Sequence, residues 1–119
     1  MTGIYEMARE LGGALSRTDE YQALKRAMDA ADDDRDLVEV RNHVQGLEER
    51  LEAVLREGQE PDEELQSAYS AAAEELQVLP GFQRLIAAQS NFEKVMYKVN
   101  ETVANGIEQG AQSRIIISS

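Results

Sequence analysis

The chain has 119 residues, enough for one domain, and a formal net charge of −11. Both halves are acidic: residues 1–60 hold 15 acids and 8 bases, and residues 61–119 hold 8 acids and 4 bases. Direct binding to nucleic acid or to an anionic membrane is not expected, because both require a basic face and the chain has no basic run. The absence of cysteine excludes disulfides, zinc knuckles and cysteine-ligated iron–sulphur clusters within the chain.

The composition favours an all-α protein. Ala, Leu, Glu, Gln and Arg are frequent, aromatic residues make up only 5%, and there are two prolines. No charged-then-apolar leader is recognisable, and no apolar run approaches the roughly eighteen residues of a membrane span. We therefore expect a cytoplasmic protein.

Two helices are predicted at the start of the chain. Apolar residues recur at helical spacing over residues 4–15 and again over residues 21–31, but the two sets are out of phase. A break is expected between them, with Thr18 as the N-cap of the second helix. Gly12 and Gly13 weaken the first helix, so they indicate either close packing against a neighbour or a hinge.

The most regular pattern in the chain lies in its centre, over residues 37–55. Its apolar residues are spaced by three, four, three, four and three positions, which places them on one stripe of a helix. Asp33 or Asp34 is predicted to cap this helix, and Gly58 to end it with a positive φ. The stripe consists of Leu37, Val40, Val44, Leu47, Leu51 and Val54.

Two further helices are predicted to follow. Pro61 is expected at the first position of a helix that runs to Leu79, where Leu79-Pro80-Gly81 interrupts the pattern. A last stripe, over residues 82–107, is the expected partner of the central stripe within the chain. Glycines near residues 106–110 predict fraying, and three isoleucines predict that residues 111–119 form an extended or disordered tail after a single helical domain of residues 1–110.

These patterns predict an all-α fold of long antiparallel helices in an elongated helical bundle. Two long stripes in a short chain favour completion of this bundle by homo-oligomerisation. The residues predicted for such an interface, which would otherwise form an intramolecular core, are Leu47, Leu51, Phe92 and Met96.

The residues predict no catalytic, cofactor-binding or metal site, and therefore no enzyme. His43 is the only histidine, and the Glu-x-x-His motif of di-iron bundles fails because Val40 stands three residues before it. The Asp32–Asp36 cluster lacks the glycine and glutamate of an EF-hand loop, so a helix-capping turn explains it better.

Two polar features each allow two interpretations. Between Glu57 and Gln83 the chain has seven acids and no base, which is either a docking surface for a basic partner or a solvated helix face. Gln89 interrupts the last stripe, where it either fixes register at a helical interface or reaches water at the edge of the core.

Several short motifs follow one another in a recognisable order. They are Ile4-Tyr5-x-x-Ala8-x-x-Leu11, Glu20-Tyr21-x-x-Leu24, the Asp-capped central helix, Gly58-x-x-Pro61, and Pro80-Gly81-Phe82 followed by Ala88-Gln89-x-x-Phe92 and Val99-Asn100. In this order and spacing the chain resembles the YlbF/YmcA family of small bacterial helical proteins. The likeness covers residues 3–108, and the tail has no counterpart in it.

The resemblance implies an all-α, homo-oligomeric protein. Some family members are non-enzymatic regulators that join a multiprotein complex, modulate an endoribonuclease and hence RNA processing, and influence competence, sporulation and biofilm formation. Those members carry iron–sulphur clusters on cysteines, a cofactor that does not carry over to this chain. We expect a homo-oligomeric regulator or adaptor with a protein partner; the alternative is a structural or holdase-like helical protein without a dedicated partner.

Overall fold

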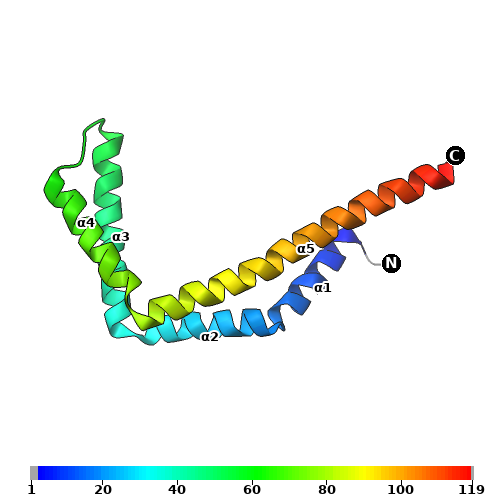
Figure 1. The fold of residues 1–119 in the computed structure, drawn as a ribbon, viewed down its shortest axis with the longest axis horizontal. Helices are drawn as coiled ribbons and strands as arrows, with labels where there is room; N and C mark the ends of the chain where they lie inside the picture. Colours follow the sequence, from blue (N-terminus) through cyan, green and yellow to red (C-terminus); the bar gives the residue numbers. More distant parts are fainter. Residues whose placement is uncertain (1–2, 119) are drawn as a thin grey trace.

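The computed structural model describes the backbone of residues 3–118 and the side chains of residues 3–112. This part of the chain is all-α and elongated, as predicted, and contains no strand (Figure 1). Its five helices are α1 (Ile4–Ser16), α2 (Asp19–Asp33), α3 (Arg35–Arg56), α4 (Glu63–Gln77) and α5 (Pro80–Ser118).

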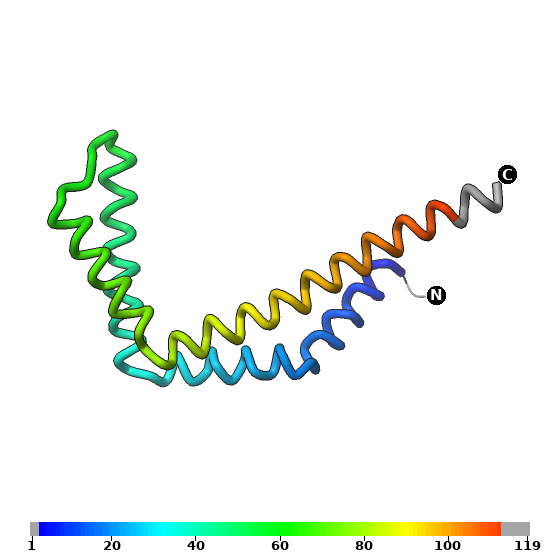
Figure 2. The backbone as a smooth tube through the Cα atoms, in the orientation of Figure 1, coloured from blue at the N-terminus to red at the C-terminus, as the bar shows by residue number. Residues whose placement is uncertain are grey.

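The helices form two arms that meet at an angle (Figures 1 and 2). In the long arm α2 runs antiparallel to α5, and α1 continues from α2 along the same arm. In the short arm α3 and α4 form an antiparallel hairpin. The chain enters the short arm at the α2–α3 turn and leaves it at the α4–α5 turn, so both turns lie at the corner between the arms.

The predicted pairing of the central stripe with the last stripe is wrong. The stripe of α3 packs against α4, and the stripe of α5 packs against α2. The reason lies in the turns: the chain folds back between Glu57 and Asp62, so α4 returns along α3 and covers it before α5 begins. The two most regular stripes therefore end up on different arms.

Local capping chemistry sets the starts of three helices. Thr18, Asp34 and Asp62 each accept a hydrogen bond from the backbone N–H three residues later, at 3.1, 3.2 and 2.8 Å. The caps predicted at Thr18 and Asp34 are thus confirmed. Pro61 does not occupy the first position of α4, because Asp62 is its N-cap. Gly58 has a φ of +77°, as predicted for the residue that follows the C-cap of α3.

The core lies at the corner and extends into the short arm. Leu37 at the start of α3 is fully buried, and four helices contribute to the cluster around it. A Cβ atom on Gly81 would lie 3.3 Å from Cδ2 of Leu37 and 3.1 Å from Oδ2 of Asp34, so the first turn of α5 approaches α3 closely. The buried residues of this cluster are Ala31, Leu37, Val44, Leu47, Ala72, Leu76 and Leu85.

A single chain is far more extended than a compact domain of its size. Its radius of gyration is 21.7 Å and its extents are 68 × 37 × 23 Å. A compact chain of this length has a radius of gyration of about 13.5 Å. The accessible surface is 9403 Å², whereas a compact monomer of this mass exposes about 6,400 Å².

The far ends of the long arm differ from the sequence-based expectation. The backbone of α5 is helical through Gly106 and Gly110 as far as Ser118, where fraying and then an extended or disordered tail were expected. Residue 119 and the side chains of residues 113–118 lie outside the described part. In α1, a Cβ on Gly12 would meet no described atom within 4 Å, and one on Gly13 would meet only Arg17, at 3.5 Å. The close neighbour expected at these glycines is thus not supplied by the described part of the chain.

Candidate interaction surfaces

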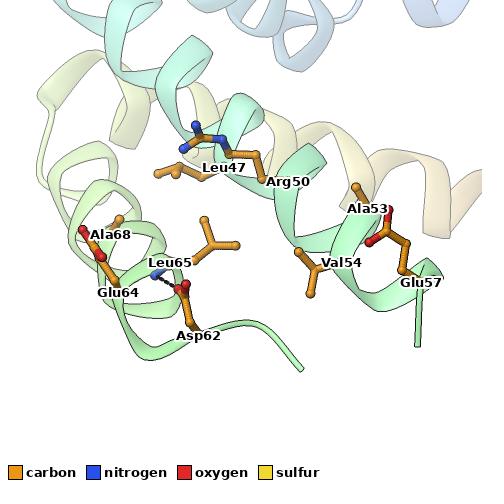
Figure 3. A pocket seen from close by; sticks show the side chains of 9 residues that line it. All are labelled: Leu47, Arg50, Ala53, Val54, Glu57, Asp62, Glu64, Leu65 and Ala68. Atoms are coloured by element: carbon orange, nitrogen blue, oxygen red, sulfur yellow. Dashed lines mark hydrogen bonds between the residues drawn. The ribbon is translucent and has the colours of Figure 1, made fainter. Parts of the chain in front are cut away.

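An open groove of about 520 Å³ lies between the two helices of the short arm, near the turn that joins them (Figure 3). We call it the α3–α4 groove. Its floor is apolar: Leu47 is buried, while Val54 and Leu65 are half-buried and reach the groove from opposite helices. The residues that line it are Leu47, Arg50, Ala53, Val54, Glu57, Asp62, Glu64, Leu65 and Ala68.

The rim of the α3–α4 groove is acidic. Glu57, Asp62 and Glu64 are exposed, and Arg50 is the single cation among the lining residues. The carboxylate of Asp62 already accepts a hydrogen bond from the backbone N–H of Leu65, so it caps α4 as well as adding negative charge to the rim. The groove therefore combines an apolar floor with an excess of negative charge.

Most of the net charge of the chain is concentrated in the short arm. Residues 35–77 hold twelve acids and four bases, which gives a net charge of −8. The remaining residues hold eleven acids and eight bases, which gives −3. The short arm is thus strongly acidic, while the long arm is close to balanced.

A polar contact ties α3 to α4 beside the packed stripe. The hydroxyl of Tyr69 donates a hydrogen bond to Oε1 of Glu48 at 3.1 Å. This bond raises the pKa of Tyr69, because it favours the protonated phenol; the nearby negative charge of Glu48 and partial burial act in the same direction. The ring of Tyr69 is partly buried against the core cluster.

Exposed apolar side chains also lie along the outer part of the long arm, on α1 and on the second half of α5, and α1 buries no residue. Their exposed fractions run from 40% to 83%. This long-arm apolar surface comprises Ile4, Tyr5, Met7, Leu11, Tyr97, Val103 and Ile107.

The structure places the four predicted interface residues in two separate pairs. Leu47 and Leu51 lie one turn apart on α3, where Leu47 is only 4% exposed and belongs to the core of its own chain. Phe92 and Met96 lie one turn apart on α5, and both are half-buried. The ring of Phe92 meets that of Tyr21 edge to face, with centroids 5.3 Å apart and planes inclined at 64°. The two pairs thus belong to different arms.

The polar residues singled out in the sequence lie on exposed helix surfaces or at a helix cap. His43 and Gln89 are exposed on α3 and α5, so Gln89 reaches solvent in the single chain. In the aspartate cluster, Asp34 caps α3, and Asp32 lies 3.3 Å from a guanidinium nitrogen of Arg41. Within the described residues, no group of three or more His, Cys, Asp or Glu side chains is arranged to hold a metal ion. Across the same residues, no helix has the length and apolarity needed to cross a membrane.

Sequence comparison assigns the chain to a family. The family model described as "Control of competence regulator ComK, YlbF/YmcA" matches residues 4–108. The chain belongs to the YlbF/YmcA family. The match spans α1 to α4 and most of α5, and thus both arms and both surfaces described above. The description of the family is that of regulatory proteins.

Curated relatives include UPF0342 proteins from several strains of Streptococcus pneumoniae. Those of strains Hungary19A-6, G54 and D39 are each 28% identical to this chain over 105 residues. The aligned region covers 82% of this chain and 94% of the relative in each case. The relatives therefore have nearly the same extent as the region that matches the family model.

Sequence reasoning missed the long-arm apolar surface as a unit. The helical pattern over residues 4–15 includes Ile4 and Leu11, and the last stripe, expected to pack on residues 37–55, includes Val103 and Ile107. The available signal was one of length: α5 has 39 residues and α2, its packing partner, has 15. An apolar stripe on a helix that is this much longer than its packing partner must remain partly uncovered within one chain.

Proposed function

We propose that this protein is a non-enzymatic, homo-oligomeric regulator or adaptor that acts in the cytoplasm by binding other proteins. The observation that carries the proposal is the surface that one chain leaves uncovered. The chain exposes about 3,000 Å² more than a compact monomer of its mass. Its exposed surface includes large apolar side chains of the long arm.

This excess is large enough for a stable interface between copies. Protein–protein interfaces of standard size bury about 800 Å² on each partner. The near-balanced charge of the long arm also allows two copies to approach there without strong repulsion. We place the interface on the long-arm apolar surface, with the half-buried Phe92 and Met96 at its margin. Leu47 is buried in the core of its own chain and Leu51 lies one turn from it on the short arm, so neither belongs to the interface proposed here.

The regulatory role rests on the family. Its description names control of the competence regulator ComK, and we propose that this chain acts in a process of that kind, with RNA processing as the step that its complex modulates. The acidic short arm suits an adaptor that contacts protein partners and not the nucleic acid itself.

The exposed apolar side chains of α1 also favour a second candidate, a holdase-like protein that covers unfolded chains. Two measurements separate the candidates. Sedimentation equilibrium at micromolar concentration should give a stable multiple of the chain mass, and a monomer would contradict the proposed assembly. Affinity capture from the native host should recover one stoichiometric partner, whereas many unrelated unfolded proteins would support the holdase.

A further inference from the structure

We propose that the α3–α4 groove binds a short helical segment of a partner protein that presents a large apolar side chain flanked by lysine or arginine. The inference rests on the proposed adaptor function and adds the surface and the chemistry of the partner. It does not depend on the long-arm interface, since the groove lies entirely on the short arm.

The shape of the groove fits one or two apolar side chains of such a segment. Its volume of about 520 Å³ is open along the helix pair, and the facing Val54 and Leu65 leave part of their surface uncovered above the buried Leu47. An amphipathic helix that lies in a groove between two helices inserts its apolar residues at helical spacing. Each large apolar side chain so covered contributes through the surface that it removes from water.

The charge of the rim selects the flanking residues. Glu57, at the C-cap of α3, and Glu64, on α4, lie on the two sides of the groove, and neither carboxylate has a side-chain hydrogen bond or ion pair among the described residues. Cations on either side of the inserted side chain would lie against these carboxylates. Such charge complementarity increases the rate of encounter and fixes the register of the bound segment.

The same charge argues against a second copy of this chain in the groove. A short arm with a net charge of −8 repels another short arm, and the long arm, at −3 for the remaining residues, offers no cationic excess. The groove and the long-arm apolar surface thus differ in charge as well as position, which favours a basic partner for the first and self-association for the second.

The test uses the full chain and a defined probe. The probe is a helical peptide of about eighteen residues with leucine on one face and lysine on the other, and its control has glutamate in place of every lysine. Amide spectra of the labelled protein locate binding, and fluorescence anisotropy measures the dissociation constant. We expect the lysine peptide to perturb the residues that line the groove, and the glutamate peptide to leave them unchanged.

Two matched pairs of substitutions separate the groove from the general negative charge of the short arm. The first pair, Glu57→Gln with Glu64→Gln, removes two carboxylates of the rim. The second pair, Glu63→Gln with Glu74→Gln, removes two from the other face of α4, where both residues line a separate shallow hollow. Each pair alters one acid in the first turn of α4 and one near a helix C-terminus, so the effects on helix stability are similar.

The first pair should weaken binding of the lysine peptide about fivefold, and the second less than twofold. Val54→Ser should also weaken binding about fivefold, while Val78→Ser, which alters an exposed valine outside the groove, should not. An equal loss in both glutamate pairs, or spectral changes away from the groove, would overturn the proposal. Sedimentation of each variant keeps the outcome distinct from a failure of the assembly, which these substitutions should leave intact.

Discussion

Gly81 and Leu37 meet at the corner of the molecule, where a Cβ on the glycine would lie only 3.3 Å from Cδ2 of the leucine. Leu37 is fully buried, so it has little room to move away. On the other side of the same position, Oδ2 of Asp34 would lie 3.1 Å from the added carbon. The close approach of α5 to the start of α3, and hence the junction of the two arms, depends on the missing side chain of Gly81.

Gly81→Ala should therefore destabilise the fold, although alanine favours a helix. The gain in helix propensity is at most about 1 kcal/mol, and overpacking at the corner costs about 1–3 kcal/mol. We expect a net loss of up to about 2 kcal/mol in the free energy of unfolding, measured with urea at a fixed protein concentration. The control is Gly46→Ala in α3, where a Cβ meets no atom within 4 Å. That change should stabilise the protein by about 0.5–1 kcal/mol; stabilisation by both substitutions would contradict the close approach.

The helices were predictable from the sequence because local chemistry determines them. The break before Thr18, the cap at Asp34 and the positive φ of Gly58 follow from residues next to one another in the chain. The pairing of the helices was not predictable in the same way. A heptad stripe indicates that a helix has an apolar partner but does not specify which one, and the short connection between α3 and α4 decided the question.

The candidate surfaces show the same limit. The acidic run that begins at Glu57 was visible in the sequence. It contains all three rim carboxylates of the α3–α4 groove, those of Glu57, Asp62 and Glu64. The apolar floor was not visible as a groove, since Leu47 and Val54 belong to the stripe that packs on α4. Only the folded structure shows that Val54 on α3 and Leu65 on α4 stay partly uncovered where the two helices pair.

The edge-to-face contact of Tyr21 with Phe92 should contribute to the packing of α2 on α5 beyond the area that the rings bury. Such aromatic pairs are worth about 0.5–1.5 kcal/mol in double-mutant cycles. We expect a coupling energy of about 1 kcal/mol between Tyr21→Leu and Phe92→Leu, measured by urea unfolding of the two single variants and the double variant. Leucine keeps an apolar side chain at each site. Additive effects would show that the rings contribute only buried area.

The hydrogen bond from Tyr69 to Glu48 should make the contribution of Tyr69 to stability depend on pH in the alkaline range. The pKa of Tyr69 is raised in the folded chain, whereas an unfolded tyrosine titrates near about 10. The stabilising effect is therefore fully present below about pH 10 and is lost as the pH rises through the higher folded value. The difference in unfolding free energy between the wild type and Tyr69→Phe should be constant below that pH and narrow above it.

A matched control is Tyr69→Phe measured in a Glu48→Gln background, where the accepting carboxylate is absent. There the difference that Tyr69→Phe makes to the unfolding free energy should narrow less above about pH 10, because the carboxylate that raises the pKa of Tyr69 has been removed. A difference between the wild type and Tyr69→Phe that widens above about pH 10 would have the opposite sign to that required by a raised pKa.

The long-arm apolar surface should control self-association without determining the fold of the single chain. Val103 and Ile107 are 51% and 69% exposed, so replacing both with serine removes little packing within one chain. If copies meet on this surface, Val103→Ser with Ile107→Ser should shift the dissociation constant of the oligomer by about tenfold or more, because each lost side chain contributes about 1 kcal/mol or more when buried between copies. Sedimentation equilibrium over a range of concentrations measures the shift.

The control for this pair is a short-arm variant, Leu55→Ser in α3 with Val78→Ser at the C-cap of α4, two side chains that are 61% and 69% exposed. It removes a similar amount of exposed apolar surface, so a general effect on solubility or hydrophobic association would appear equally in both double variants. Far-UV circular dichroism should show unchanged helix content in each. If the long-arm variant kept its oligomer while the short-arm variant dissociated, the interface would have to lie on the short arm. Its net charge of −8 would then require bound cations or a different approach of the two copies.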